Sequence, residues 1–241
     1  KKILEISAAS PTSSFEILIF FTTSFLNKNN WYITLCVSDS DLSSSNPIVT
    51  DYRTGWAFDV CCPSEWYAAI IFRDKSTQYP SVFMVNVDED STLVATEATV
   101  LENYVVKWNI CVWVTKLQDT DANIFCALWT RNYNESSAET LDWKTRYCIC
   151  SFSGLTITTW TLDVFQWNVN KSSHTPFWYM WNWVVWMVSS SINESSTHDC
   201  TIWARPYSEW SFWSSRYETI DTKSGSGFVT WPQLLWLWWN K

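Results

Sequence analysis

Residues 175–188 read TPFWYMWNWVVWMV and hold four tryptophans within fourteen residues. Such a run is compatible with a membrane helix, with an aromatic binding surface, or with two consecutive buried strands. Pro176 to Val188 is thirteen residues long and contains Asn182, whereas a bilayer-spanning helix needs about 20 apolar residues. We therefore interpret the run as a strand region at 177–188, in which a loop and a strand pair join near Asn182.

The same strand signal continues along most of the chain. Runs rich in Val, Ile, Thr, Tyr, Phe and Trp are separated by polar clusters, a pattern typical of β-strands. In YVVKWNICVWVTK (104–116), Ile110, Val112 and Val114 alternate with Cys111, Trp113 and Thr115, which predicts a sheet with two unlike faces. The predicted strands are 15–22, 31–38, 56–62, 66–73, 81–87, 105–115, 123–130, 145–151, 155–161, 177–188 and 199–213.

One segment has helical periodicity instead. In DEDSTLVATEATVLENY (88–104) the apolar residues Val94, Ala98, Leu101 and Val105 recur at helical spacing. Asp90 or Ser91 can cap its start, where acidic residues also suit the helix dipole. The sequence thus predicts an all-β chain with one or two short helices, built as a two-sheet sandwich.

Length and composition favour one domain over the whole chain. Its 241 residues contain 47% hydrophobic and 17% charged residues, with no linker or defensible internal repeat. We predict a single domain over 1–241, with an amino-terminal segment at 1–30 and a carboxyl-terminal tail at 217–241. Only 4 glycines accompany 20 tryptophans, so we expect Asn, Asp and Ser to adopt the positive φ angles of turns.

Charge and hydropathy restrict the partners. The net charge is −8, and no block of Lys or Arg is present, so the chain offers no basic arm for RNA. The opening apolar run is broken by Glu5, Pro11 and Glu16, which argues against a signal peptide. The apolar end FVTWPQLLWLWWNK (228–241) is too short to span a bilayer. We therefore expect no membrane span.

The eight cysteines do not form a metal motif. No CxxC pair occurs, and only two histidines are present, so a zinc site has little support. Cys148 and Cys150 project from one face of a strand, while the adjacent Cys61 and Cys62 point to opposite faces. We interpret the cysteines as buried free thiols, with secreted disulfides as the alternative. They are residues 36, 61, 62, 111, 126, 148, 150 and 200.

Other chemistry-bearing residues also have simpler explanations. His174 and His198 lack a partner that the sequence can position, and glycines at 55, 154, 225 and 227 cannot build a phosphate-binding loop. The acidic groups 88–90 and 119–121 are interpreted as solvated charges. Glycosylation sequons occur at Asn134, Asn170 and Asn193, as many as chance predicts for this composition, so they do not indicate secretion. We assign no catalytic, cofactor-binding or metal residue and predict that the chain is not an enzyme.

A longer pattern resembles a known family. PSVFMVNVDEDSTLVATEATVLENYVVKWNICVWV (80–114) is similar to a stretch in the capsid proteins of picornaviruses, dicistroviruses and iflaviruses, above all the third major capsid protein, VP3. The order of features is similar over 80–216, and KKILEISAAS (1–10) resembles the segment that opens the family's ordered β-structure. EWSFWSSR (209–216) keeps the aromatic-Ser-aromatic-Arg rhythm of its last strand. Ile110 stands where the family usually has glycine.

The resemblance implies an eight-stranded antiparallel jelly-roll β-sandwich. It implies a structural protein of a non-enveloped icosahedral positive-strand RNA virus, assembled in the host cytoplasm and located in the virion. Its expected partners are VP1-like and VP2-like sister subunits, symmetry copies of itself, and a host receptor. The genomic RNA is enclosed, with little direct binding because the chain is acidic.

Two other classes of β protein remain open. A secreted carbohydrate-binding sandwich would use exposed Trp and Tyr rings to stack on sugars. The tryptophans are spread over most predicted strands, however, which is more typical of core and interface positions. An immunoglobulin-like module would require a Cys…Trp…Cys spacing that is not evident.

Overall fold

The computed structural model describes most of the chain as β-structure. Within the described residues every regular element is a β-strand, the strands pair antiparallel, and no helix is present. None of these residues forms a helix long and apolar enough to cross a membrane. The all-β prediction is therefore confirmed. The described residues are 2–9, 17–24, 31–38, 48–87, 92–106, 112–117, 123–131, 144–166, 174–181, 184–192, 197–208, 211–212 and 216–224.

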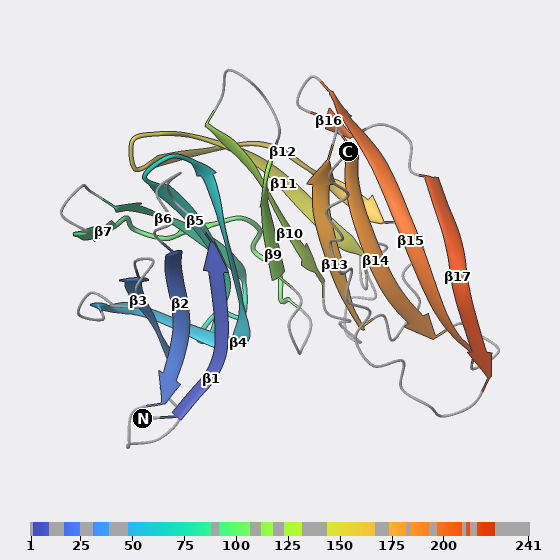
Figure 1. Ribbon diagram of the computed structural model, residues 1–241, viewed down its shortest axis with the longest axis horizontal. Coiled ribbons are helices and arrows are strands. Elements are labelled where there is room, and N and C mark those ends of the chain that lie inside the picture. The colour runs from blue at the N-terminus through green and yellow to red at the C-terminus, as the bar shows by residue number, and fades with distance from the viewer. Residues whose placement is uncertain are drawn as a thin grey trace.

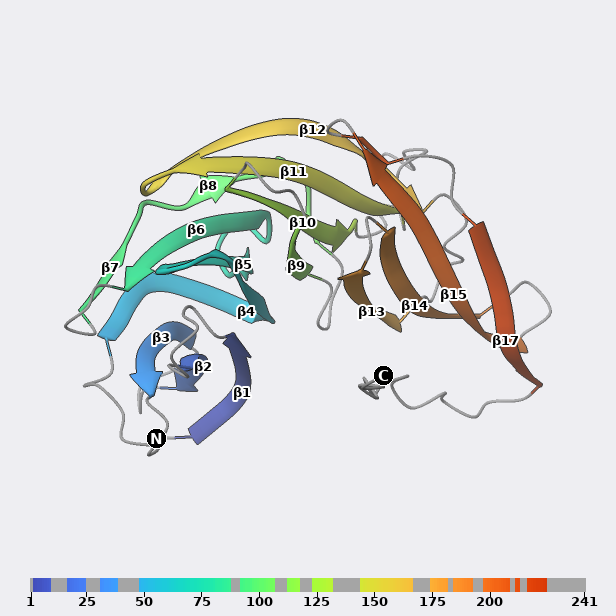
Figure 2. The same ribbon diagram turned by 45° about the horizontal axis from the view of Figure 1, so that its top comes forward.

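The amino-terminal sheet has eight strands: β1 to β7 are hydrogen-bonded in chain order (Figure 1), and β8, labelled in Figure 2, pairs with β6. Its unusual member is the 17-residue β4, which pairs with β3 through its first half and with β5 through its second half. The strands are β1 (Lys2–Ala9), β2 (Ile17–Ser24), β3 (Trp31–Ser38), β4 (Ile48–Ser64), β5 (Tyr67–Asp74), β6 (Pro80–Val87), β7 (Leu93–Ala95) and β8 (Thr99–Val100).

Two further sheets follow along the chain. The second sheet has the order β12-β11-β10-β9, and the third runs β13-β14-β15, with β16 and β17 both paired to β15. Figure 2 shows β11 and β12 above β4, β5 and β6, with the third sheet beside them. The strands are β9 (Val112–Lys116), β10 (Ile124–Thr130), β11 (Thr145–Ser153), β12 (Thr156–Gln166), β13 (His174–Trp181), β14 (Val184–Ile192), β15 (Thr197–Ser208), β16 (Ser211–Phe212) and β17 (Arg216–Ser224).

The central strands β5 and β6 are buried on both faces. Ala69 and Ile71 of β5 belong to one hydrophobic cluster, while Ala68, Ile70 and Phe72 belong to another. Because side chains alternate along a strand, the apolar run YAAIIF supplies both clusters at once. The first cluster packs the amino-terminal sheet against β9, β10 and β11, and the second is closed by Ile33 and Leu35 of β3. This layered packing is compatible with a β-sandwich.

Two turns adopt positive φ without glycine. Trp66 and Gln78 both have φ of 65°, whereas Gly154 has φ of 56°. The expectation that Asn, Asp and Ser fill such positions is wrong for these two turns. Hydrogen bonds hold them instead: Asn86 Nδ2 donates to the Trp66 carbonyl at 3.0 Å, and Arg73 Nη2 donates to Gln78 Oε1 at 2.6 Å.

The turn after β5 is organised by one carboxylate. Asp74 Oδ1 accepts from the backbone N–H and hydroxyl of Ser76 at 2.9 and 2.7 Å, and from the same groups of Thr77 at 2.7 and 2.9 Å. Burial raises the pKa of Asp74, but these hydrogen bonds outweigh it and leave the pKa below its ordinary value.

Replacing Asp74 with alanine is expected to lower the free energy of unfolding at pH 7 by about 1–2 kcal/mol, because four donors lose their acceptor. Urea denaturation measures the change. Asp51→Ala, at an exposed carboxylate of β4, is the matched control and should alter stability by less than about 0.5 kcal/mol. Equal losses in both variants would contradict the role of the Asp74 side chain.

The predicted helix at 88–104 is wrong. Residues 92–104 contain β7 and β8, while 88–91 lie outside the described residues. Val94 is 48% exposed, so the apolar spacing does not form one buried face. Thr96 instead lies alongside β6 and is hydrogen-bonded to Met84: its N–H donates to the Met84 carbonyl, and its Oγ1 accepts from the Met84 N–H, both at 3.0 Å. Threonine and valine favour this extended backbone.

The strand predictions are mostly confirmed, with differences at their ends. The run at 177–188 contains parts of two strands, β13 and β14, paired from Trp181 and Val184 outward, so the single strand region with a leading loop is wrong there, while Asn182 lies outside the described residues. Residues 199–213 contain β15 and β16, whereas 105–115 retain only β9 among their described residues. Val112 and Val114 are both buried, as their alternation predicts. Strands β1 and β17 and the first half of β4 lie outside the predicted strand ranges.

Candidate functional site

Strand β12 is an edge strand with apolar side chains in solvent. It pairs with β11 and ends the four-stranded sheet. Trp160 is 61% exposed, the largest value among the described large apolar residues, and Leu162 is 44% exposed. No charged residue occurs between Thr156 and Leu162. Edge strands are normally protected by charges, proline or a covering element. This edge, residues 156–162, is therefore a candidate contact surface.

A β-bulge places Trp160. The β11–β12 register changes from Ile149↔Thr161 to Cys150↔Thr159, which leaves Trp160 as the extra residue of β12. Its indole Nε1 donates to Ser151 Oγ at 2.7 Å. Bulges redirect side chains at sheet edges. The ring is thus held outward in a defined orientation.

The carboxyl end of β12 is attached to the third sheet. Arg205 of β15 donates from Nη1 to the carbonyls of Val164 and Phe165, both at 2.8 Å. Its guanidinium lies 5.3 Å from the Phe165 ring centroid and 6.0 Å from that of Tyr147. Burial lowers the pKa of Arg205, and the nearby Tyr147 and Asp163 partly oppose this effect. Arg205 therefore attaches the carboxyl end of β12 to the third sheet, and the uncharged residues 156–162 make up the rest of the strand.

A buried cluster of charged side chains connects Glu102 to Arg131, which follows β10, and to Arg146 of β11. Glu102 Oε1 accepts from Arg131 Nη2 at 2.6 Å and from Arg146 Nε at 3.3 Å, while Oε2 accepts from Arg131 Nε at 3.1 Å and Trp129 Nε1 at 2.7 Å. The Glu102 side chain is 7% exposed. The Arg131 guanidinium also lies 4.0 Å from the Tyr104 ring centroid. One carboxylate thus holds two arginines and an indole in place.

Electrostatics keep Glu102 ionised. Burial raises the pKa of Glu102, but the hydrogen bonds from Arg131 and Trp129 and the charge of Arg146 outweigh it, so the pKa lies below its ordinary value. A general acid needs a pKa near the working pH. With a depressed pKa and filled acceptor sites, Glu102 is suited to hold the loop 101–106 against β10 and β11, and we interpret this cluster as structural.

The described cysteines are free and mainly buried. Cys61, Cys62, Cys126, Cys148 and Cys150 form no disulfide. Cys61 packs against one hydrophobic cluster and Cys62 against the other, and the sulfurs of Cys148 and Cys150 lie 3.8 Å apart, so both face assignments are confirmed. Burial raises the pKa of Cys62 to about 12 and that of Cys61 and Cys126 well above the ordinary range.

Of the other chemistry-bearing residues noted in the sequence, the structure describes no side chain. His174 and His198 lie on β13 and β15, where the structure describes only their backbone. The acidic groups 88–90 and 119–121, and Asn134, Asn170 and Asn193, lie outside the described residues, as does Cys111. In the part of the chain that the structure describes, no group of three or more His, Cys, Asp or Glu could hold a metal ion.

Sequence reasoning missed both Glu102 and the β12 edge. Glu102 lies in the predicted helix, where its charge has no special role, and its arginine partners are 29 and 44 residues away. The stretch TITTWTL (156–162) does indicate a contact surface, because a run without charges that contains a tryptophan is unusual for an exposed edge strand. No protein-family model matches the chain, and no curated protein matches it.

Proposed function

We propose that this chain is a structural capsid protein of a non-enveloped icosahedral positive-strand RNA virus, of the VP3 type. The observation that carries the proposal is the uncharged edge strand at 156–162, with the apolar side chains of Trp160 and Leu162 in solvent. Apolar side chains that stand exposed on an edge strand offer contact area to a neighbouring chain. The resemblance of residues 80–216 to the capsid family supports the same function.

In this function the sheets have a structural role. Their buried faces form the core, and their edges and exposed side chains bury surface against sister subunits and symmetry copies. The net charge of −8 means that the chain supplies little neutralisation to the RNA that the shell encloses. Location in the virion, assembly in the host cytoplasm and recognition of a host receptor belong to this proposal.

The finer fold within the proposal is an eight-stranded jelly roll. A jelly roll consists of two Greek keys, in which strands distant in sequence become neighbours. The described pairings join strands that are near one another in the chain. The proposal therefore expects further pairings between distant strands in the assembled particle. The strand order in a structure of that particle tests this expectation.

Electron microscopy of the native material tests the function directly. The expected result is closed spherical shells in negative stain, with this chain identified in them by mass spectrometry of the purified particles. Isolated subunits in all preparations, with no shell that contains the chain, would contradict the proposal.

Replacing Trp160 and Leu162 together with serine is expected to reduce subunit association at least tenfold, because the edge loses its apolar contacts. Sedimentation of the purified chain measures association. Val94→Ser with Val100→Ser is the matched control, since these residues of β7 and β8 are 48% and 46% exposed but lie elsewhere. If the β12 variant associates as strongly as the control, the edge is not the contact surface.

A second candidate function is carbohydrate binding, favoured by the geometry of Trp160 alone. Its ring is 61% exposed and held outward by the bond to Ser151, which suits stacking on a sugar face. A glycan array tests this candidate. Binding that Trp160→Ala abolishes would support it, and a blank array would reject it.

A further inference from the structure

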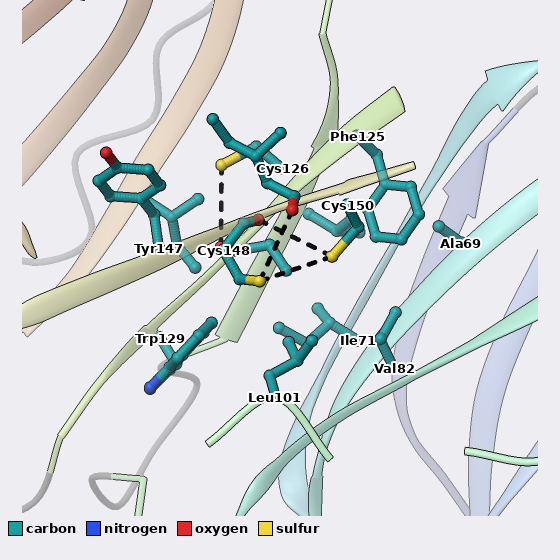
Figure 3. Close-up of a cluster of buried hydrophobic side chains, with 14 of the residues drawn as sticks. Ala69, Ile71, Val82, Leu101, Phe125, Cys126, Trp129, Tyr147, Cys148 and Cys150 are labelled. Atoms are coloured by element: carbon teal, nitrogen blue, oxygen red, sulfur yellow. Dashed lines mark hydrogen bonds between the residues drawn. The ribbon is translucent and has the colours of Figure 1, made fainter. Parts of the chain in front are cut away.

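Cys148 and Cys150 form a close pair of thiols inside the sandwich. They lie two residues apart on β11, and the Cys150 thiol approaches Cys148 Sγ at 3.8 Å. The two residues are 1% and 0% exposed. Figure 3 shows their sulfurs side by side, near Phe125, Leu101, Ile71 and Val82. The proposed capsid function makes no use of this pair.

The local hydrogen bonds distinguish the two sulfurs. Cys148 receives a hydrogen bond from the Cys150 thiol and one from the backbone N–H of Trp160, the bulge residue of β12. The Cys150 hydrogen bond is the main cause of a lowered pKa for Cys148; burial and Glu102 oppose it, and Arg146 assists it. The same hydrogen bond raises the pKa of Cys150 well above its ordinary value. Cys148 is thus the better nucleophile of the pair.

We propose that Cys148 and Cys150 are a reversible oxidation site for hydrogen peroxide. The Cys148 thiolate attacks one peroxide oxygen, the O–O bond breaks, and the released hydroxide takes a proton to become water, which leaves a sulfenic acid. The Cys150 sulfur then attacks the Cys148 sulfur, its proton leaves with the hydroxyl as a second water, and an S–S bond forms. Two thiols are oxidised, and one peroxide is reduced to two waters.

The strand geometry makes this disulfide easy to reduce. Residues two apart on an extended strand have Cα atoms about 6.4–6.8 Å apart, at the upper end of the range for disulfides. The sulfurs must also close from 3.8 Å to about 2.05 Å, so β11 has to bend at Ile149. The bulge opposite Ile149 and Cys150 already interrupts the ladder there. A strained bond of this kind has the higher potential typical of regulatory disulfides.

Access is provided by the edge strand. Cys148 is paired with Leu162 and Cys150 with Thr159, both exposed residues of β12. Strands at sheet edges open locally more often than central strands. Peroxide is small enough to enter through such an opening, whereas bulky alkylating reagents react slowly.

Intact-mass analysis of the native chain after treatment with hydrogen peroxide tests the site. The expected product is lighter by about 2 Da, the mass of two hydrogens, carries a Cys148–Cys150 link in its peptide map, and returns to the original mass with dithiothreitol. Cys150→Ser should stop at the sulfenic acid, which dimedone traps on Cys148. Cys126→Ser is the matched control, at a third buried thiol, and should react like the wild type.

The peptide map of the wild-type chain decides the result even if a variant fails to fold. Free Cys148 and Cys150 after treatment, detected by alkylation in denaturant, would overturn the proposal. A link from either residue to Cys61 or Cys126 would overturn it as well. Both readouts are made on the isolated chain, in which no neighbouring subunit covers β12, so the oxidation site and the capsid function can fail separately.

Discussion

Glu102→Gln is expected to lower the free energy of unfolding at pH 7 by about 3–5 kcal/mol. The substitution keeps the size of the side chain but removes the charge that compensates Arg131 and Arg146, whose side chains are 10% and 9% exposed. Guanidinium groups cannot shed their charge, so both stay buried without a counter-ion. Urea denaturation followed by tryptophan fluorescence measures the loss.

Glu97→Gln provides the control, because Glu97 lies in the same segment but is exposed. It removes the same charge from the chain and is expected to change stability by less than about 0.5 kcal/mol. If the two variants are equally stable, the buried cluster contributes nothing specific.

The stability contribution of Glu102 also has a defined pH dependence. Its pKa in the folded chain lies below the ordinary value, so the folded state favours the ionised form. The contribution is fully present above the pKa of the unfolded chain, about 4.3, and is lost as the pH falls through the folded pKa. The wild type and Glu102→Gln should therefore differ at pH 7 and converge in acid. A difference that grows in acid would contradict this assignment.

Trp129→Ala is expected to cost about 3–5 kcal/mol of unfolding free energy. Trp129 is the largest fully buried side chain among the described residues, at 0% exposure. Its removal leaves a cavity in the hydrophobic cluster that the second sheet helps to form, and it deletes the hydrogen bond to Glu102. Trp160→Ala is the matched control: the same truncation at an exposed ring should cost less than about 1 kcal/mol.

A double-mutant cycle separates the packing of Trp129 from its hydrogen bond. Trp129→Phe keeps most of the ring volume but removes the donor to Glu102. Combined with Glu102→Gln, its effect should be non-additive by about 0.5–3 kcal/mol, because the two side chains share one network. Strict additivity would show that the indole acts through packing alone.

Much of the fold follows from local sequence. The runs 31–38, 123–130 and 145–151 are strands as predicted, because β-branched and aromatic residues are bounded there by polar turns. Cys61 and Cys62 point to opposite faces because strand side chains alternate, whatever the tertiary structure. These features need no knowledge of distant partners.

The errors arise where distant contacts override local preference. The segment 92–104 has helical spacing, but Thr96 pairs with Met84 and Glu102 is held by Arg131 and Arg146. Trp66 takes a positive φ that its residue type disfavours, with its carbonyl accepting from Asn86. The candidate contact surface was missed for the same reason, since only the sheet order makes β12 an edge.

The length of β4 has a consequence for how the chain unfolds. Its residues pair with β3 from Ile48 to Arg53 and with β5 from Thr54 to Ser64. Opening the first half of β4 therefore weakens only the ladder with β3, and opening the second half weakens only the ladder with β5. In hydrogen-exchange experiments, the amides of β3 and β5 should exchange through separate opening events, with different opening free energies. The first strands can then melt while the central strands stay paired.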